Sequence, residues 1–231
     1  MPEPRMIIVA GPSGGGKSSL FPISKIEGVA AFSTDDYCAN LYAQRLGRSA
    51  PVYAGIPPDI REQGGRAFQQ FIENKINARL SLSFETTLRD ITFDQARLAK
   101  NSGFRVEMIF VAAGPVEEHI ERVKNRAQAG GHSAPESSLR EIYSRGMKLL
   151  LRAFDENRKG NIETLAVFHN PRSTREADLT PSRATLIVEM VRGDPAQLLP
   201  EPPPAWFEAA VMSTSFEIEK LRERARDYFQ R

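Results

Sequence analysis

The chain has 231 residues, of which 41% are hydrophobic and 26% are charged, a balance typical of one sizeable globular α/β domain. A formal net charge of +2 is too small to indicate binding to nucleic acid or to an anionic membrane. The single cysteine, Cys38, excludes an internal disulfide and a zinc site built from several cysteines. No apolar run is long enough for a signal peptide or a membrane span, so we expect a cytoplasmic protein.

Strands and helices alternate along most of the chain. In chain order, the predicted elements are a strand over residues 5–10, a helix over 17–26, a short strand over 30–33, an irregular stretch over 41–58, a helix over 58–80, a strand over 80–86, a helix over 92–101, a strand over 105–112, helices over 115–129 and 137–154, a strand over 165–169, a short edge strand over 185–192, a proline-rich connector over 199–204 and a helix over 215–230.

This alternation predicts a mostly parallel sheet of five to six strands with helices on both faces, a three-layer α/β/α fold. We expect one domain over residues 1–231, with a core over about 5–173 and a C-terminal extension over 174–231 packed on it. Ligands of such sheets bind at the carboxyl ends of the strands, so polar residues there are the candidates for chemistry.

The segment GPSGGGKS at residues 11–18 lies between the first predicted strand and the helix that follows it. Its pattern, G-x-x-x-x-G-K-[ST], is that of a P-loop, in which bare backbone N–H groups surround phosphate oxygens. Lys17 would neutralise charge between the β- and γ-phosphates, and Ser18 would ligate Mg²⁺. The residues expected to bind ATP are Gly11, Ser13, Gly14, Gly15, Gly16, Lys17, Ser18 and Ser19.

Carboxylates follow the second and third predicted strands. Asp35 and Asp36 come after the second strand and Glu85 ends the third, so both sets should border the P-loop. Transfer of a phosphoryl group to an alcohol needs a carboxylate that takes the proton of the hydroxyl group. The alternative is a helix-capping or turn role for the aspartates and a solvated loop position for Glu85.

Two arginines lie four residues apart on the helix predicted over 115–129. Arg122 and Arg126 can therefore reach one anion, and a glycine pair at 130–131 allows the helix to act as a lid with an arginine at the γ-phosphate. The alternative is a solvated basic face. His132 would bind or orient the substrate or simply lie in a turn, whereas His119 and His169 read as structural.

Four segments resemble the zeta-toxin-like group of P-loop kinases, in the bacterial branch of predicted ABC-type ATPases. They are GPSGGGKSS at 11–19, STDDY at 33–37, SFETTLR at 83–89, and ERV at 121–123 with the following Arg126 and GGHSAPE at 130–136. The resemblance runs from about residue 5 to residue 173, with Asn170 near the end of the last core strand.

This resemblance implies a kinase fold of the shikimate-kinase or chloramphenicol-phosphotransferase type that uses Mg-ATP. The best-known members phosphorylate the amino sugar of UDP-N-acetylglucosamine. The implied roles are general base for Asp35, phosphate contact for Arg122 or Arg126, and substrate binding after the third strand. The residues expected to bind substrate are Asp36, Glu85, Thr87, Arg89, His132 and Arg140. Asp36 replaces the usual Glu, and Arg140 remains of a richer arginine stretch.

The leading hypothesis is therefore a kinase that moves the γ-phosphate of ATP to a hydroxyl of a small metabolite, such as a nucleotide sugar. The alternatives are a nucleoside or nucleotide kinase and an ATP-binding regulatory protein without kinase activity. An antitoxin protein is the expected macromolecular partner, with no nucleic acid and no membrane. The signature Leu-Ser-Gly-Gly-Gln of ABC motors is missing from the sequence.

Overall fold

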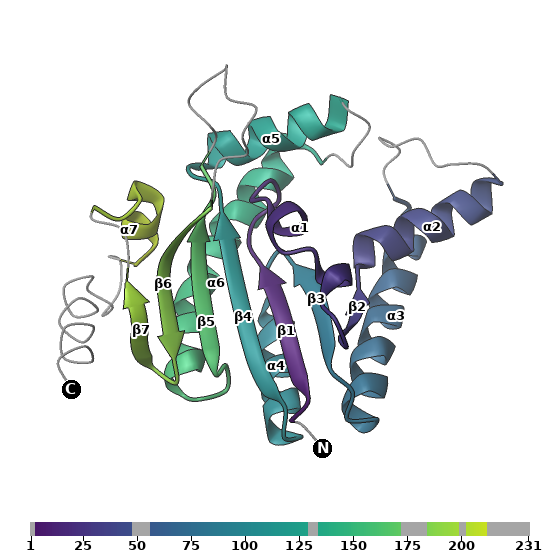
Figure 1. The fold of residues 1–231 in the computed structure, drawn as a ribbon. Helices are drawn as coiled ribbons and strands as arrows, with labels where there is room; N and C mark the ends of the chain where they lie inside the picture. Colours follow the sequence, from purple (N-terminus) through teal and green to yellow (C-terminus); the bar gives the residue numbers. More distant parts are fainter. Residues whose placement is uncertain (1–2, 48–55, 129–133, 172–183, 199–201, 212–231) are drawn as a thin grey trace.

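The computed structural model describes residues 3–47, 56–128, 134–171, 184–198 and 202–211. The strands of this part form one sheet in the order β2-β3-β1-β4-β5-β6-β7 (Figure 1). The first five in that order are parallel, whereas β6 pairs antiparallel with β5 and with β7. The strands are β1 Arg5–Ala10, β2 Ala30–Phe32, β3 Leu82–Thr86, β4 Arg105–Ala112, β5 Thr164–His169, β6 Thr185–Val191 and β7 Asp194–Leu198.

Helices lie on both faces of this sheet. Figure 1 shows α4 and α6 behind the strands and the short α1 in front, where β1 ends. The helices are α1 Lys17–Leu20, α2 Thr34–Leu46, α3 Pro58–Asn77, α4 Asp90–Asn101, α5 Val116–Gln128, α6 Glu136–Arg158 and α7 Ala205–Val211. This arrangement confirms the predicted class, a mostly parallel P-loop α/β fold. No described helix is both long enough and apolar enough to cross a lipid bilayer.

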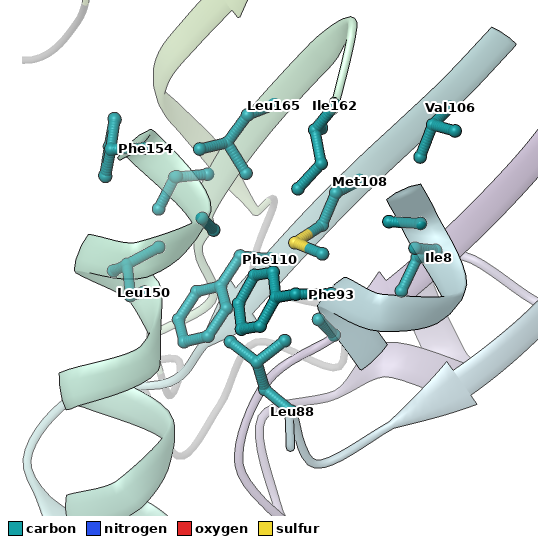
Figure 2. Packing of buried hydrophobic residues seen from close by; sticks show 14 of the residues in the cluster. Ile8, Leu88, Phe93, Val106, Met108, Phe110, Leu150, Phe154, Ile162 and Leu165 are labelled. Carbon is teal, nitrogen blue, oxygen red and sulfur yellow. The ribbon is translucent and has the colours of Figure 1, made fainter. Parts of the chain in front are cut away.

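The main core lies between the sheet and the helices behind it. Alternate residues of β1 and β4, among them Ile8 and Phe110, pack with Phe93 of α4 and Leu150 of α6 (Figure 2). Each fully buried side chain of this size stabilises the fold by about 1.5–3 kcal/mol. The core therefore holds the carboxyl ends of the strands in place. The candidate residues for chemistry lie in the segments that follow these ends.

Two helix boundaries differ from the prediction. The helix after the P-loop ends at Leu20 instead of near residue 26, because Pro22 cannot continue it; a 3-10 turn over Ile23–Lys25 follows. The predicted irregular stretch from residue 41 is wrong up to residue 46, where α2 continues to a left-handed Gly47 at φ 62°. Residues 48–55 lie outside the described part.

The sheet has one strand more than predicted. β6 is not at the edge, because a two-residue turn at Arg192 and Gly193, both with positive φ, returns the chain as β7. β7 contains Pro195, which is tolerated because β7 is an edge strand.

The C-terminal extension also contributes to the core. α7 was missed by the prediction, and its Trp206 and Phe207 rings pack near Phe110 and Phe154, at centroid distances of 6.5 and 6.4 Å. The helix predicted over 215–230 lies outside the described residues. Because β6, β7 and α7 share the sheet and the core, we propose that residues 1–231 form one domain.

Candidate active site

The P-loop has the backbone conformation that its glycines predict. Gly11, Gly14 and Gly16 have φ values of 135°, 81° and 93°, which residues with a side chain rarely adopt. A Cβ at Gly11 would collide with the Val111 carbonyl oxygen, and one at Gly14 with the His119 carbonyl oxygen. The loop is therefore pressed against the end of β4 and the start of α5, which leaves its other side for a ligand.

Lys17 folds back across this loop. Its Nζ donates to the carbonyl oxygens of Gly11, at 2.8 Å, and Pro12, at 3.1 Å. Desolvation lowers the pKa of Lys17 to about 8, against the opposing charges of Glu85 and Asp35, while Arg126 adds to the lowering. The ammonium group thus lies within electrostatic range of one arginine and two carboxylates named by the sequence.

The side chains of Ser18 and Glu85 are in direct contact beside the carboxyl ends of β1 and β3. Ser18 Oγ donates to Glu85 Oε2 at 2.9 Å, because β3 lies next to β1 and brings the end of β3 beside the loop. Burial raises the pKa of Glu85, as do the nearby Asp35 and Asp36, while Ser18 and Lys17 lower it. Hydroxyl and carboxylate oxygens are the donors that Mg²⁺ prefers, and Mg²⁺ commonly binds through one or two such groups together with phosphate oxygens. The donor set therefore fits this ion.

Asp35 and Asp36 occupy the first turn of α2. Ser33 caps this helix, since its Oγ accepts from the backbone N–H of Asp36 at 3.2 Å. The positive end of the helix dipole therefore lies beside both carboxylates. Both side chains are exposed, and their charges act on Glu85. The N-cap of α2 is therefore Ser33, and the alternative in which an aspartate caps this helix is wrong.

The loop after β3 is shaped by a buried leucine. Leu88 has φ 65°, an uncommon conformation for this residue, and is fully buried beside Phe93 and Phe110 (Figure 2). Its N–H donates to Thr86 Oγ1 at 3.0 Å. Because the side chain of Leu88 points into the core, Thr87 and Arg89 on either side remain partly or fully exposed. Both are thus available above the strand ends, as a substrate-binding role requires.

The two arginines of α5 differ in their surroundings. Figure 1 shows α5 above the carboxyl ends of the strands. Arg122 Nη2 donates to Glu118 Oε1 at 2.8 Å and to the Asn170 carbonyl oxygen at 2.7 Å, and its Nη1 lies close to Gly16. Arg126 is exposed and its charge acts on Lys17. Arg122 is therefore fixed beside the loop, whereas Arg126 extends toward the solvent side.

Of the remaining two predicted substrate residues, only Arg140 lies in the described part, and its ion pairs are with α5 and α6. Arg140 pairs with Glu136 of its own helix and with Glu117 of α5, at 2.8 and 3.0 Å. His132 and the neighbouring glycines lie outside the described residues. Arg140 therefore holds α6 to α5 and is exposed to solvent at their contact.

Two residues that support the loop were not among the predicted site residues. His119 Nε2 accepts from the Ala113 N–H at 2.9 Å, so the proton is on Nδ1, which donates to the Ser13 carbonyl oxygen at 2.9 Å. Asn170 Nδ2 donates to the Gly15 carbonyl oxygen at 3.0 Å. A signal existed for both: His119 lies one turn before Arg122, and Asn170 directly follows β5. His169 is structural, since its Nδ1 accepts from Trp206.

His119 should make the stability depend on pH. Burial lowers its pKa from 6.5 to about 4, with a smaller contribution from the charges of Arg122 and Lys17. Between these two pH values the unfolded chain binds a proton at this imidazole and the folded chain does not. The contribution of neutral His119 to the free energy of unfolding is therefore complete above pH 6.5 and is lost as the pH falls toward 4. Over this range we expect the free energy of unfolding of wild type to fall by about 2–4 kcal/mol more than that of His119→Asn. Urea unfolding at each pH measures both. Equal losses would contradict it.

The glycine loop, the half-buried lysine and the parallel sheet define a P-loop kinase-like protein. Solved structures share this fold. A chain of the AvrRxo1-ORF1:AvrRxo1-ORF2 complex with sulphate ions is 15% identical at a TM-score of 0.64, covering 84% of this chain and 60% of its own. A chain of the same complex with ATP is 14% identical, with a TM-score of 0.61 and the same coverage. A chain of the PezAT chromosomal toxin-antitoxin system of Streptococcus pneumoniae is 14% identical, with a TM-score of 0.53. The match covers 79% of this chain and 76% of the PezAT chain.

The sequence itself identifies the family. The profile described as Zeta toxin matches residues 1–176, and the chain therefore belongs to the zeta toxin family. The resemblance found in the motifs is thus confirmed, and the fold is that of P-loop kinase-like proteins. The chain spans about 60% of the length of the AvrRxo1 chains that it matches. A comparison with functionally curated proteins gives no significant match.

Proposed function

We propose that this protein transfers the γ-phosphoryl group of ATP to a hydroxyl group of a small metabolite. The observation that carries the proposal is the convergence of three elements: the P-loop with Lys17, the end of β3 with the Ser18–Glu85 contact, and the start of α2 with Asp35 within electrostatic reach of Lys17. A loop that only bound nucleotide would not need carboxylates from two further elements beside it.

The side chains would divide the work by position. Asp35 would accept the proton of the acceptor hydroxyl, because it is exposed in the first turn of α2 and its charge acts on Lys17. Lys17 and Arg126 would balance charge that develops on the transferred group, and Arg122 would hold the edge of the loop. Ser18 and Glu85 would hold Mg²⁺, which when bound supplies positive charge between the phosphates.

The acceptor we would test first is the amino sugar of UDP-N-acetylglucosamine, because the motifs resemble those of enzymes that phosphorylate it. Glu85, Thr87 and Arg89 would contact it from the end of β3, with Asp36 beside them. The PezAT structure is described as a toxin-antitoxin system, and on that basis we propose an antitoxin protein as the partner of this chain in the cytoplasm.

The test is a product assay. The protein is incubated with ATP, Mg²⁺ and either UDP-N-acetylglucosamine or a bacterial metabolite pool, and mass spectrometry searches for a compound that has gained one phosphoryl group. We expect a new phosphomonoester that is absent with Asp35→Asn. A phosphorylated nucleoside or nucleotide would instead favour the nucleotide-kinase alternative. Turnover of ATP with no phosphorylated product in any pool would contradict phosphoryl transfer and favour a regulatory ATPase.

A further inference from the structure

We infer that His119 and Asn170 are positioning residues that turn two backbone amides of the P-loop toward the phosphate site before any ligand binds. This inference rests on the proposed use of the P-loop for ATP. It goes beyond that proposal because neither side chain is part of the P-loop or among the carboxylates and arginines to which the proposal gives a role. Both hold a loop carbonyl oxygen from outside.

His119 fixes the peptide group between Ser13 and Gly14. The C=O and N–H of one trans peptide group point in opposite directions. When Nδ1 of His119 holds the Ser13 carbonyl oxygen at 2.9 Å on the α5 side, the N–H of Gly14 is turned away from α5. A Cβ at Gly14 would collide with the His119 carbonyl oxygen, so this glycine lies directly against the start of α5.

Asn170 fixes the peptide group between Gly15 and Gly16 by the same geometry. Its Nδ2 holds the Gly15 carbonyl oxygen at 3.0 Å, which turns the N–H of Gly16 the other way. A Cβ at Gly16 would collide with this Nδ2, so the amide of Asn170 packs directly on the loop. The two side chains therefore set alternate peptide groups, which lets the amides of both glycines converge.

Both positioning side chains are themselves held in place. His119 Nε2 accepts from the N–H of Ala113, and the Tyr143 ring packs edge-on at 5.2 Å from the imidazole. Asn170 donates its backbone N–H to the Ala112 carbonyl oxygen at 2.8 Å and accepts from Arg122 through its own carbonyl. These contacts lead to the end of β4, to α5 and to α6, so the loop is held against the sheet and the helices packed on it.

Such bracing matters because four glycines give the loop many conformations in which its amides do not converge. Amides that are already oriented bind an anion without a further loss of conformational entropy. The cost of losing one oriented amide is that of a hydrogen bond to a charged group, which corresponds to roughly a 10- to 100-fold weaker affinity for phosphate.

Two substitutions at His119 separate positioning from packing. In His119→Asn, the amide nitrogen replaces Nδ1 and can still donate to Ser13, while the bond to Ala113 is lost. In His119→Gln, the amide oxygen replaces Nε2 and can still accept from Ala113, while the bond to Ser13 is lost. Each variant loses one hydrogen bond, so destabilisation alone should affect both to a similar degree.

The measurement is calorimetric binding of ADP and of inorganic pyrophosphate to the full chain. We expect His119→Gln to bind both roughly 10- to 100-fold more weakly than wild type, and His119→Asn to stay close to wild type. Asn170→Asp, which places an oxygen against the Gly15 carbonyl, should weaken binding at least as much. Asn157→Asp is the control, because Asn157 is also a buried asparagine but binds backbone atoms of Ile162 and Gly193 instead.

The outcomes separate the two proposals. If wild type binds neither ADP nor pyrophosphate, the proposed function fails. If wild type binds both and His119→Gln and Asn170→Asp bind as tightly as it does, the positioning role is wrong while the function stands. Equal weakening in the two His119 variants, or equal weakening in Asn157→Asp and Asn170→Asp, would also overturn the positioning role, because general loss of stability would then explain the data.

Discussion

Asp35→Asn should lower kcat for phosphoryl transfer by about 10²–10⁴-fold, the usual contribution of a well-placed general base. The substitution keeps the size of the side chain and its place in the first turn of α2, so the fold should not change. The affinity for ATP should stay near that of wild type, because Asp35 lies outside the P-loop. The measurement pairs steady-state transfer with calorimetric binding of ATP.

The matched control is Asp59→Asn. Asp59 also lies in the first turn of a helix and is exposed, but it pairs with Arg45 at 2.5 Å and belongs to α3. Transfer by this variant should be close to that of wild type. If Asp35→Asn transferred phosphate undiminished, Asp35 would not be the base. A large loss in Asp36→Asn would then assign the base to the neighbouring carboxylate.

Lys17→Met should lower kcat/KM for ATP by about 10²–10³-fold, a loss typical of removing one group that stabilises the transition-state charge. Methionine keeps the length of the side chain but cannot donate to Gly11 or Pro12 or carry charge. Both binding and turnover should suffer, in contrast to Asp35→Asn. Lys25→Met, which removes an exposed lysine just after α1, is the control.

The pH profile gives Lys17 a second signature. Because its pKa is lowered to about 8, kcat/KM of wild type should fall as the pH rises through about 8, where the free protein loses this charge. Lys17→Arg stays charged, so its lower activity should not show this fall. A wild-type profile that is flat to pH 10, or an unchanged fall in Lys17→Arg, would show that another group controls it.

The sequence by itself determined the parts of this protein that depend on near neighbours. The P-loop is one run of eight residues between a strand and a helix, and three of its four glycines, Gly11, Gly14 and Gly16, adopt the positive φ that favours glycine. The alternation of strands and helices was enough to predict a parallel sheet and thus that Glu85 and Asp35 follow strands near the loop. These features are local, or follow from rules of topology that hold for the whole fold class.

Other local signals were present but were outweighed. No strand was predicted over residues 194–198, and it is the antiparallel pairing with β6 that makes β7 part of the sheet. The glycine and proline residues between 47 and 58 suggested an irregular stretch, yet Ser33 caps a helix that continues to residue 46. α7 is short, and the aromatic pair that it buries against α6 becomes visible as core only once the helix is placed.

The contacts that complete the site came only from the tertiary structure. Ser18 meets Glu85 across 67 residues, His119 meets the Ser13 carbonyl across 106, and Asn170 meets the Gly15 carbonyl across 155. No periodicity or spacing encodes such pairs, because they depend on which strands become neighbours and on how closely α5 packs on the loop. The sequence therefore named the groups that would carry the chemistry, and the packing of the sheet decided which side chains hold them in position.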